Sequence, residues 1–269
     1  MLGKESIMIL FDTHAHYDSG GFNADREEVL SALPDAGVKL VVNPGCDVES
    51  SRAAVALAER YPYVYAAVGI HPEDCAGASD ADFDEIRALC GHEKAVAVGE
   101  IGLDYYWKEN PPKEFQIEVF RRQIELALEM DLPVIIHDRE AHGDSLSIVQ
   151  EYPGLRGVFH CFSGSPEMAE ELLKRGWYLG FDGPITYKNA RRAPEVAAVT
   201  PLERMVVETD SPYLSPVPLR GKRNDSRNLP YVVEKLAEWK GITPEEMARI
   251  TFENGLRLFG LEAEAPRNI

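Results

Sequence analysis

The chain has 269 residues, of which 45% are hydrophobic, and this is enough to bury a large core. No apolar run approaches the roughly 20 residues that cross a bilayer, and the first residues lack a signal peptide's hydrophobic stretch, so we expect no membrane association and a cytoplasmic protein. The formal net charge of −17 argues against broad nonspecific adhesion to nucleic acid, although divalent ions bound among the carboxylates would offset part of it.

Short β-branched or apolar runs recur about every 25 to 40 residues, and helical spacing follows each of them. Eight such runs are the expected strands: residues 8–12, 38–43, 63–68, 95–99, 133–137, 157–160, 177–181 and 204–208. The clearest helices are expected at residues 53–60, 115–130, 166–175 and 231–239, followed by a final pair at 244–251 and 253–259. This alternation predicts an α/β fold with a parallel sheet, a (β/α)8 TIM barrel.

The chain shows no long linker, low-complexity tract or sharp internal repeat. Barrels of this class usually form one domain of roughly 250 residues, so residues 1–269 are expected to be a single domain. Residues 1–7 are expected to be a disordered or poorly packed extension, and residues 217–230 an ordered surface loop. Four scattered cysteines form no Cys-x-x-Cys pair and are interpreted as small packing residues: Cys46, Cys75, Cys90 and Cys161. Nothing indicates an obligate protein partner.

Polar residues stand at the carboxyl ends of several predicted strands. The first run ends in Asp12-Thr13-His14-Ala15-His16, where a period of two places both imidazoles on one face, close enough to share an ion. Taken alone, this pair could equally be a chance feature of a surface loop. Further candidates close or follow later runs: Glu100, His137, His160 and Asp210. In a barrel all these ends meet at one face, where active sites lie.

A buried imidazole or carboxylate costs several kcal/mol unless it is paired, and a metal ion would pair all of these residues together. Each one singly could instead be a hydrogen-bonded core or rim residue. Six ligands exceed the needs of one tetrahedral ion, so we predict two divalent ions about 3.5 to 4 Å apart, bridged by Glu100. Asp210 is then expected to hold or deprotonate the attacking water. Histidine ligands suit Zn, Mn, Fe or Ni better than Mg. The metal that the enzyme uses in catalysis stays open, with Mg and Mn as candidates.

Six ordered blocks resemble the signature blocks of TatD deoxyribonucleases, which belong to the amidohydrolase-like barrels. These blocks are residues 12–16, Gly69-Ile70-His71-Pro72, 99–105, 133–139, His160-Cys161-Phe162-Ser163-Gly164 and 208–214. With residues 254–259 the resemblance covers nearly the whole chain. It implies metal-dependent hydrolysis of DNA, often as a 3′ to 5′ exonuclease. It also implies six metal ligands: His14, His16, Glu100, His137, His160 and Asp210.

One block departs from the family pattern. Many members carry Asn-Glu-Pro in the loop after the last strand, where this chain has Asn224-Asp225-Ser226. The acid is kept, but the rigidity of the proline is lost. The change puts substrate positioning by this loop in question and leaves the implied metal ligands untouched.

Three further residues are candidates for substrate contacts. His71 follows the third predicted strand and is expected to contact the scissile phosphate or assist proton transfer; alternatively, it caps the turn beside Pro72. Arg139 and Arg223 are candidates for bidentate hydrogen bonds to phosphate oxygens, the alternative being solvated charges on loops.

The loop after Glu100 is rich in aromatic residues. Tyr105, Tyr106 and Trp107 could stack on an unpaired base, a contact that contributes ~1 to 3 kcal/mol, or could pack against the barrel rim. His92 precedes its strand and His142 lies beyond His137, so both are interpreted as surface histidines.

The leading hypothesis is a phosphodiesterase that acts on single-stranded or frayed 3′ ends of DNA, since a barrel mouth narrowed by loops should admit one strand better than a duplex. The alternative is hydrolysis of a small amide, ester or phosphotriester on the same scaffold. The sequence speaks weakly against it, because the fourth strand offers Glu100 where many dinuclear amidohydrolases carry a modified lysine. A non-catalytic module that binds metal or nucleic acid is a third possibility.

Overall fold

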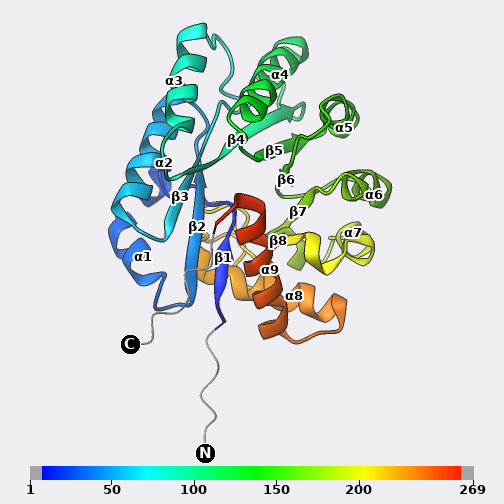
Figure 1. The fold of residues 1–269 in the computed structure, drawn as a ribbon. Helices are drawn as coiled ribbons and strands as arrows, with labels where there is room; N and C mark the ends of the chain where they lie inside the picture. The colour runs from blue at the N-terminus through cyan, green and yellow to red at the C-terminus, as the bar shows by residue number, and fades with distance from the viewer. Residues whose placement is uncertain (1–7, 262–269) are drawn as a thin grey trace, which may run out of the picture.

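Eight parallel strands form the centre of the molecule in the computed structural model, which describes residues 8–261 (Figure 1). The strands are β1 Leu10–Asp12, β2 Val38–Pro44, β3 Val64–Val68, β4 Ala95–Asp104, β5 Val134–Arg139, β6 Gly157–Phe159, β7 Tyr178–Phe181 and β8 Met205–Val207. They are hydrogen-bonded in sequence order from β1 to β8. Backbone bonds bring the first and last strands together: Thr13 N donates to Val207 O at 3.2 Å, and Asp210 N donates to His14 O at 2.9 Å. The predicted TIM barrel is confirmed.

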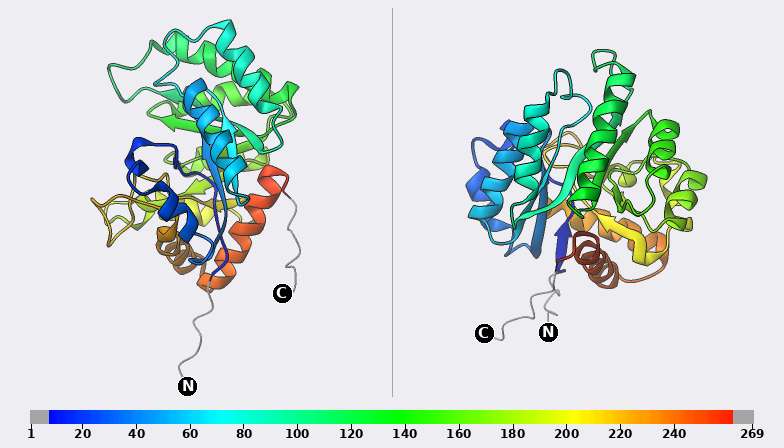
Figure 2. Two further views of the ribbon diagram at one scale, coloured as in Figure 1. Left: turned by 90° about the vertical axis from the view of Figure 1, so that its left-hand side faces the viewer. Right: turned by 45° about the horizontal axis from the view of Figure 1, so that its top comes forward.

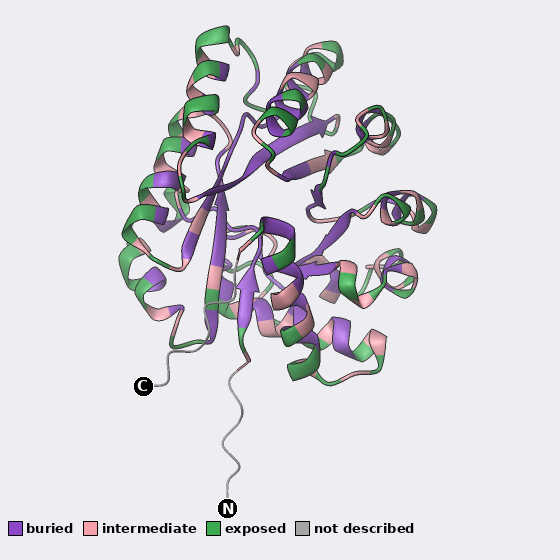
Figure 3. Cartoon of the chain, viewed as in Figure 1, coloured by how far each residue is buried: buried purple, intermediate pink, exposed green. Residues whose placement is uncertain are grey.

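Helices surround these strands and turn their polar faces to solvent. They are α1 Arg26–Ala32, α2 Val48–Arg60, α3 Asp80–Cys90, α4 Lys113–Glu129, α5 His142–Gln150, α6 Pro166–Lys174, α7 Ala193–Val199, α8 Leu229–Lys240 and α9 Pro244–Phe259. Short 3-10 turns are η1 Gly20–Phe22, η2 Gly183–Thr186, η3 Leu202–Arg204 and η4 Ser226–Asn228. Figure 3 shows the strands mostly buried, with exposed residues near one end of β2 and of β5, and exposed residues on the outer sides of the helices. Within residues 8–261, no helix is long and apolar enough to cross a membrane.

The predicted pair of helices at the carboxyl end is wrong, because α9 is continuous. The Thr243 side chain accepts a hydrogen bond from Glu246 N at its start, and Gly260 ends it in the left-handed conformation at φ 64°. Gly255 does not interrupt it: a Cβ there would lie 2.5 Å from Cδ1 of Phe11, so the glycine lets the helix approach β1 closely. Figure 2 shows α9 beside α8, close to β1.

The predicted end of the fourth strand is also wrong, since β4 continues to Asp104 and holds Glu100 in its interior. The β4–β5 pairing shifts register between Val98 and Ile101, which places Glu100 at the irregularity. Gly102 has φ +142°, and a Cβ there would overlap the carbonyl oxygen of His137. A glycine is therefore needed where β4 and β5 run side by side at the polar end of the barrel.

Two other expectations concern segments outside the barrel strands. The predicted loop 217–230 is shorter than expected, because η4 begins at Ser226 and α8 at Leu229. The Asp225 side chain accepts a hydrogen bond from Arg227 N and starts this turn. The expected extension at residues 1–7 lies outside the described residues.

Apolar side chains fill the inside of the barrel away from its carboxyl end. A cluster of buried side chains joins several strands with Leu258 and Phe259 of α9, and Phe11 of β1 packs 5.9 Å from the Phe259 ring. A larger cluster packs the helices on the outer face of the sheet. Burial of this kind contributes about 25 cal/mol per Å² of apolar surface, so the core holds the strands in register and fixes the polar residues at their ends.

Candidate active site

The structure brings the six predicted metal ligands together at the carboxyl ends of the strands. They are His14 and His16 after β1, Glu100 in β4, His137 in β5, His160 after β6 and Asp210 after β8. All but His14 line a cavity of about 800 Å³, and His14 lies fully buried behind it. His16 and Asp210, from the two ends of the chain, thus line one pocket.

One oxygen of Glu100 faces the first group of donors. Glu100 Oε2 lies 3.2 Å from His14 Nε2 and 3.5 Å from His16 Nε2. Asp210 Oδ1 lies 3.6 Å from His14 Nε2 and 3.5 Å from His16 Nε2. The two imidazole nitrogens are themselves 3.0 Å apart. Four potential ligand atoms therefore converge on one point.

The other oxygen of Glu100 faces a second group. Glu100 Oε1 lies 2.8 Å from His137 Nδ1 and 2.7 Å from His160 Nε2. His137 Nδ1 and His160 Nε2 are 3.4 Å apart. His71 Nε2 lies at the edge of this group, 3.7 Å from Glu100 Oε1. A single carboxylate thus lies between two sets of imidazoles.

These donor atoms fit divalent metal ions. A four-coordinate ion with ligands about 2.1 Å away holds those ligands roughly 3.4 Å from one another. The separations in the first group are 3.0 to 3.6 Å, and the two imidazole nitrogens of the second group are 3.4 Å apart. The 2.7 and 2.8 Å contacts of Glu100 Oε1 in the second group are hydrogen-bond distances. The donors form three overlapping sets, and within each set the ligand atoms lie within 4.8 Å of one another. The sets are His14 with His160 and Asp210, His14 with His16 and Glu100, and His71 with Glu100 and His137. Imidazole and carboxylate donors suit the first-row transition metals.

The charges at the site depend on these close contacts. Burial alone would raise the pKa of Glu100, but the nearby His160 and the hydrogen bond from His137 hold it well below its usual range. Burial opposes protonation of His137 as well, yet its hydrogen bonds to Asp104 and Glu100 raise the pKa of His137 to about 9. In the metal-free protein at neutral pH, His137 is therefore protonated and forms an ion pair with the ionised Glu100.

A metal ion must displace that proton from His137, so metal affinity should depend on pH. Below the pKa of about 9 the protonated ring competes with the metal, and the affinity is expected to rise about tenfold per pH unit for each proton released. Calorimetric titration of Mn²⁺ at neutral pH, in buffers that differ in ionisation enthalpy, should show release of at least one proton. A buffer-independent heat would contradict this protonation state.

Asp104, which the sequence did not single out, holds the far side of the His137 ring. Its Oδ2 lies 3.0 Å from His137 Nε2, while its Oδ1 accepts from Tyr106 N at 2.9 Å and from Asn110 Nδ2 at 3.0 Å. The side chain is fully buried at the end of β4. A carboxylate in this position holds Nε2 and so directs Nδ1 of the imidazole toward Glu100 and the cavity.

Asp104→Asn is expected to weaken metal binding by about 10- to 100-fold, because the His137 ring would lose its orienting acceptor. Metal titrations followed by activity should show a higher metal requirement with turnover largely recovered at saturation. The control is Asp144→Asn, which loses only an exposed hydrogen bond from the Tyr105 hydroxyl. An unchanged metal requirement in Asp104→Asn would show that this contact does not orient His137.

Two more buried carboxylates support the candidate ligands. Glu208 Oε1 lies 3.5 Å from His160 Nδ1 and accepts from Cys161 N at 2.5 Å. Asp12 accepts from Thr209 Oγ1 at 2.6 Å and from Thr209 N at 3.0 Å, which ties the segment after β1 to the segment after β8. Burial raises the pKa of Asp12 to about 7 against these hydrogen bonds. Both acids stand at strand ends, and this placement is the sequence signal that could have identified them.

His71 lines the cavity and differs from the other histidines in its protonation. Its Nδ1 accepts a hydrogen bond from Glu73 N at 3.2 Å, so the neutral ring carries its proton on Nε2, on the Glu100 side. Burial and the neighbouring His137 lower the pKa of His71 to about 3. The ring is therefore a neutral hydrogen-bond donor at the cavity wall.

The two candidate arginines lie in different places. Arg139 lines the cavity, and its guanidinium lies 4.0 Å from the Tyr106 ring centroid and 5.4 Å from that of Trp107. Arg223 does not line it; its guanidinium forms a bidentate ion pair with Asp25 at 2.7 and 2.6 Å. The structure thus brings Arg139 to the site and holds Arg223 against α1.

The structure also shows where the aromatic loop after Glu100 and the two histidines interpreted as surface residues lie. Trp107 lines the cavity mouth and is 48% exposed, whereas Tyr105 turns its hydroxyl to Asp144. His92 pairs with Glu59 at 3.2 Å, and His142 begins α5 and pairs with Asp138 at 2.8 Å. Neither histidine lines the cavity, as expected.

Comparisons with known proteins agree with this geometry. The family model for TatD related DNase matches residues 11–260. YabD of Bacillus subtilis, named an uncharacterized metal-dependent hydrolase, is 45% identical over 93% of this chain and 99% of its own length. The 3′-5′ ssDNA/RNA exonuclease TatD of Cronobacter sakazakii is 36% identical over 93% of this chain and 97% of its own.

A solved structure shows the same arrangement of the chain. The crystal structure of YJJV, a TatD homolog from Escherichia coli, superposes with a TM-score of 0.89 at 33% identity, covering 96% of this chain and 100% of that one. The structural match therefore extends over nearly the whole barrel. The chain belongs to the TatD family of metal-dependent hydrolases.

Proposed function

We propose that this protein is a two-metal phosphodiesterase that removes nucleotides from the 3′ end of single-stranded DNA. The observation that carries the proposal is the position of Glu100, whose two oxygens each lie within 3.5 Å of a separate pair of imidazole nitrogens. One carboxylate between two donor groups is the arrangement of a dinuclear centre. The exonuclease name of the Cronobacter relative supports a nucleic acid as the substrate.

Each donor group would hold one ion. His14 and His16 would bind the first, His137 and His160 the second, with Glu100 between them and Asp210 beside the first. When bound, divalent ions would neutralise charge on the phosphate and make a nearby water more acidic. We expect Mn, Zn, Fe or Ni to bind these histidines readily, with Mg or Mn as working metals.

Asp210 is the proposed residue that holds or deprotonates the attacking water. Burial opposes its ionisation, but its hydrogen bond to His16 and the nearby His14 and His160 lower the pKa of Asp210. The group is therefore a carboxylate at neutral pH, and it lines the cavity where a phosphate would enter. An ionised oxygen here can accept a proton from water and orient its lone pair.

His71 and Arg139 are the proposed contacts to the phosphate. The Nε2 proton of His71 can donate to a phosphate oxygen without adding charge, because the ring is neutral. Arg139 is exposed at the cavity mouth and offers a planar fork that suits a phosphate. Arg223 would reach the substrate only after leaving Asp25, so its contact is proposed for a rearranged loop.

Aromatic side chains at the rim support the preference for an unpaired strand. Tyr106 and Trp107 are half exposed beside Arg139, and base stacking on such rings contributes ~1 to 3 kcal/mol. Bases in a duplex already stack on each other and cannot use these rings.

The proposed setting is the cytoplasm, a reducing compartment consistent with four free cysteines. We also propose that the chain acts as a single domain.

The assay uses oligodeoxynucleotides labelled at the 5′ end, single-stranded or blunt duplex, with Mg²⁺ or Mn²⁺. Stepwise shortening of the labelled single strand, slower cleavage of the duplex and loss of both with a chelator are the expected results. Lactones, cyclic amides and phosphotriesters in the same preparation test the alternative chemistry of related scaffolds. Absence of metal-dependent shortening of either DNA would contradict the proposal.

A further inference from the structure

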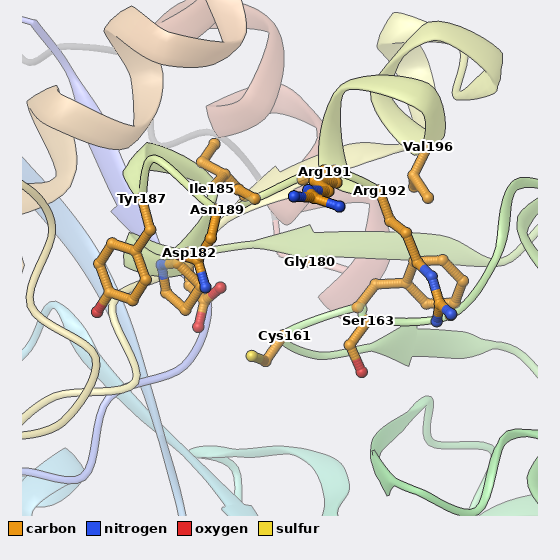
Figure 4. A pocket seen from close by; sticks show the side chains of 15 residues that line it. Cys161, Ser163, Gly180, Asp182, Ile185, Tyr187, Asn189, Arg191, Arg192 and Val196 are labelled. Carbon is orange, nitrogen blue, oxygen red and sulfur yellow. The ribbon is translucent and has the colours of Figure 1, made fainter.

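A second cavity of about 400 Å³ opens beside the metal cavity (Figure 4). We name it the side cavity; it is lined by residues 161–164 after β6, Gly180 and Asp182 at β7, η2, and the segment that leads into α7. The two cavities share Cys161, the neighbour of His160 in the chain. A polymeric substrate that reaches the metal ligands therefore has an adjoining space of a size that suits a small ligand.

Positively charged side chains gather around the side cavity. Arg191 and Arg192 both line it and both are exposed. Among residues 8–261, neither guanidinium has an ion-pair or hydrogen-bond partner. Lys188 is exposed in the same segment, and Arg220 lies 4.4 Å from the centroid of the Tyr187 ring that lines the cavity. In a chain of net charge −17, such a group of cations is suited to hold an anion.

The side cavity also carries a buried carboxyl group, one oxygen of which has no partner among the described residues. Asp182 is only 2% exposed, and its Oδ2 has no hydrogen-bond partner among the described residues. Figure 4 shows Asp182 near Asn189 and Tyr187, away from Arg192 and Ser163. A buried polar atom without a partner costs about 1 to 3 kcal/mol, which a ligand N–H group would recover. The side cavity thus offers both cations and a hydrogen-bonding carboxyl group.

We propose that the side cavity binds the nucleotide next to the scissile bond, with Arg191 and Arg192 on its phosphate and Asp182 bonded to an N–H group on the edge of its base. This inference rests on the proposed phosphodiesterase function and assigns a subsite to it. A nucleotide combines the two features that the side cavity requires, an anion and a base edge that carries N–H groups. The contacts leave the metal ligands untouched, so they act on substrate binding and not on the reacting atoms.

The test compares two substrates in the metal-loaded enzyme. A short single-stranded oligodeoxynucleotide reaches both cavities, whereas bis(4-nitrophenyl) phosphate has a single diester and needs only the metal cavity. Arg191→Ala with Arg192→Ala is expected to raise KM for the oligonucleotide by at least about tenfold, from the loss of two charge-assisted hydrogen bonds. The kcat/KM for bis(4-nitrophenyl) phosphate should stay within about twofold of the wild-type value.

Lys174→Ala with Arg175→Ala is the matched control. It removes the same charge at the end of α6, at the opposite end of the barrel from the metal cavity. Asp182→Asn is a second variant, expected to raise KM for the oligonucleotide alone; the exposed arginines keep the test valid if this buried substitution prevents folding.

Equal losses with both substrates, an equal effect of the control pair, or no effect of the arginine pair would each overturn the subsite. If the wild-type protein cleaves neither substrate, the proposed function fails instead. In that case, fluorescence anisotropy of the labelled oligonucleotide still tests whether the subsite exists. Weaker binding by the Arg191→Ala, Arg192→Ala variant than by the wild-type protein supports the subsite, and unchanged binding refutes it.

Discussion

Glu100→Gln is expected to lower kcat for a single-stranded oligonucleotide by at least about 10³-fold while the barrel stays folded. Glutamine keeps the size of the side chain but carries no charge and offers one weakly ligating oxygen. Both groups of imidazoles use this carboxylate, at 2.7 to 2.8 Å on one side and 3.2 to 3.5 Å on the other. The substitution should therefore weaken both metal positions together.

The measurements for Glu100→Gln are metal content by mass spectrometry, steady-state turnover and circular dichroism. The control is Asp74→Asn, which removes one carboxylate from the wall of the same cavity without belonging to any donor set in the described residues. The control should keep its metal and most of its turnover. A Glu100→Gln protein that bound metal normally and turned over near the wild-type rate would disprove the bridging role.

Asp210→Asn is expected to lower kcat by about 10²- to 10⁴-fold, the range for loss of a positioned proton acceptor. Asparagine keeps the hydrogen-bonding shape but cannot accept the proton of a water. His14 and His16 remain, and so do Glu100 and the second group, so the protein should still bind metal. In this variant the turnover should therefore fall while the metal content is kept, whereas Glu100→Gln should lower both.

The measurements for Asp210→Asn are made at saturating Mn²⁺, with the same Asp74→Asn control. Loss of turnover with at least half of the wild-type metal content supports Asp210 as the group that holds the water. Near-normal turnover would show that another residue performs this role. Loss of all bound metal would instead identify Asp210 as an essential ligand and not as a proton acceptor.

The sequence was sufficient to predict the strands, and to predict that the candidate metal ligands lie together, for a physical reason. An acid or imidazole such as Glu100 or His137 interrupts an otherwise apolar run, and the barrel topology brings the ends of all such runs to one face. The length of β4 was not predictable from its apolar pattern, because the strand continues beyond Glu100 through Gly102 to Asp104. Continuity of α9 across Gly255 likewise depends on its contact with Phe11 of another element.

Contacts between distant loops account for the rest of what the sequence could not predict. Asp104 and Glu208 are acids at strand ends, but only the fold shows that each lies behind a particular histidine. Arg223 is separated from Asp25 by 198 residues, and nothing in its local sequence indicates that ion pair. The side cavity likewise forms only where the loops after β6 and β7 meet.

The most direct test of the two-metal account is anomalous diffraction from crystals of the protein grown with Mn²⁺. We predict two anomalous peaks about 3.5 to 4 Å apart, with Glu100 between them, His14 and His16 on one peak, and His137 and His160 on the other. A single peak, peaks that Glu100 does not join, or metal bound away from these histidines would contradict the account.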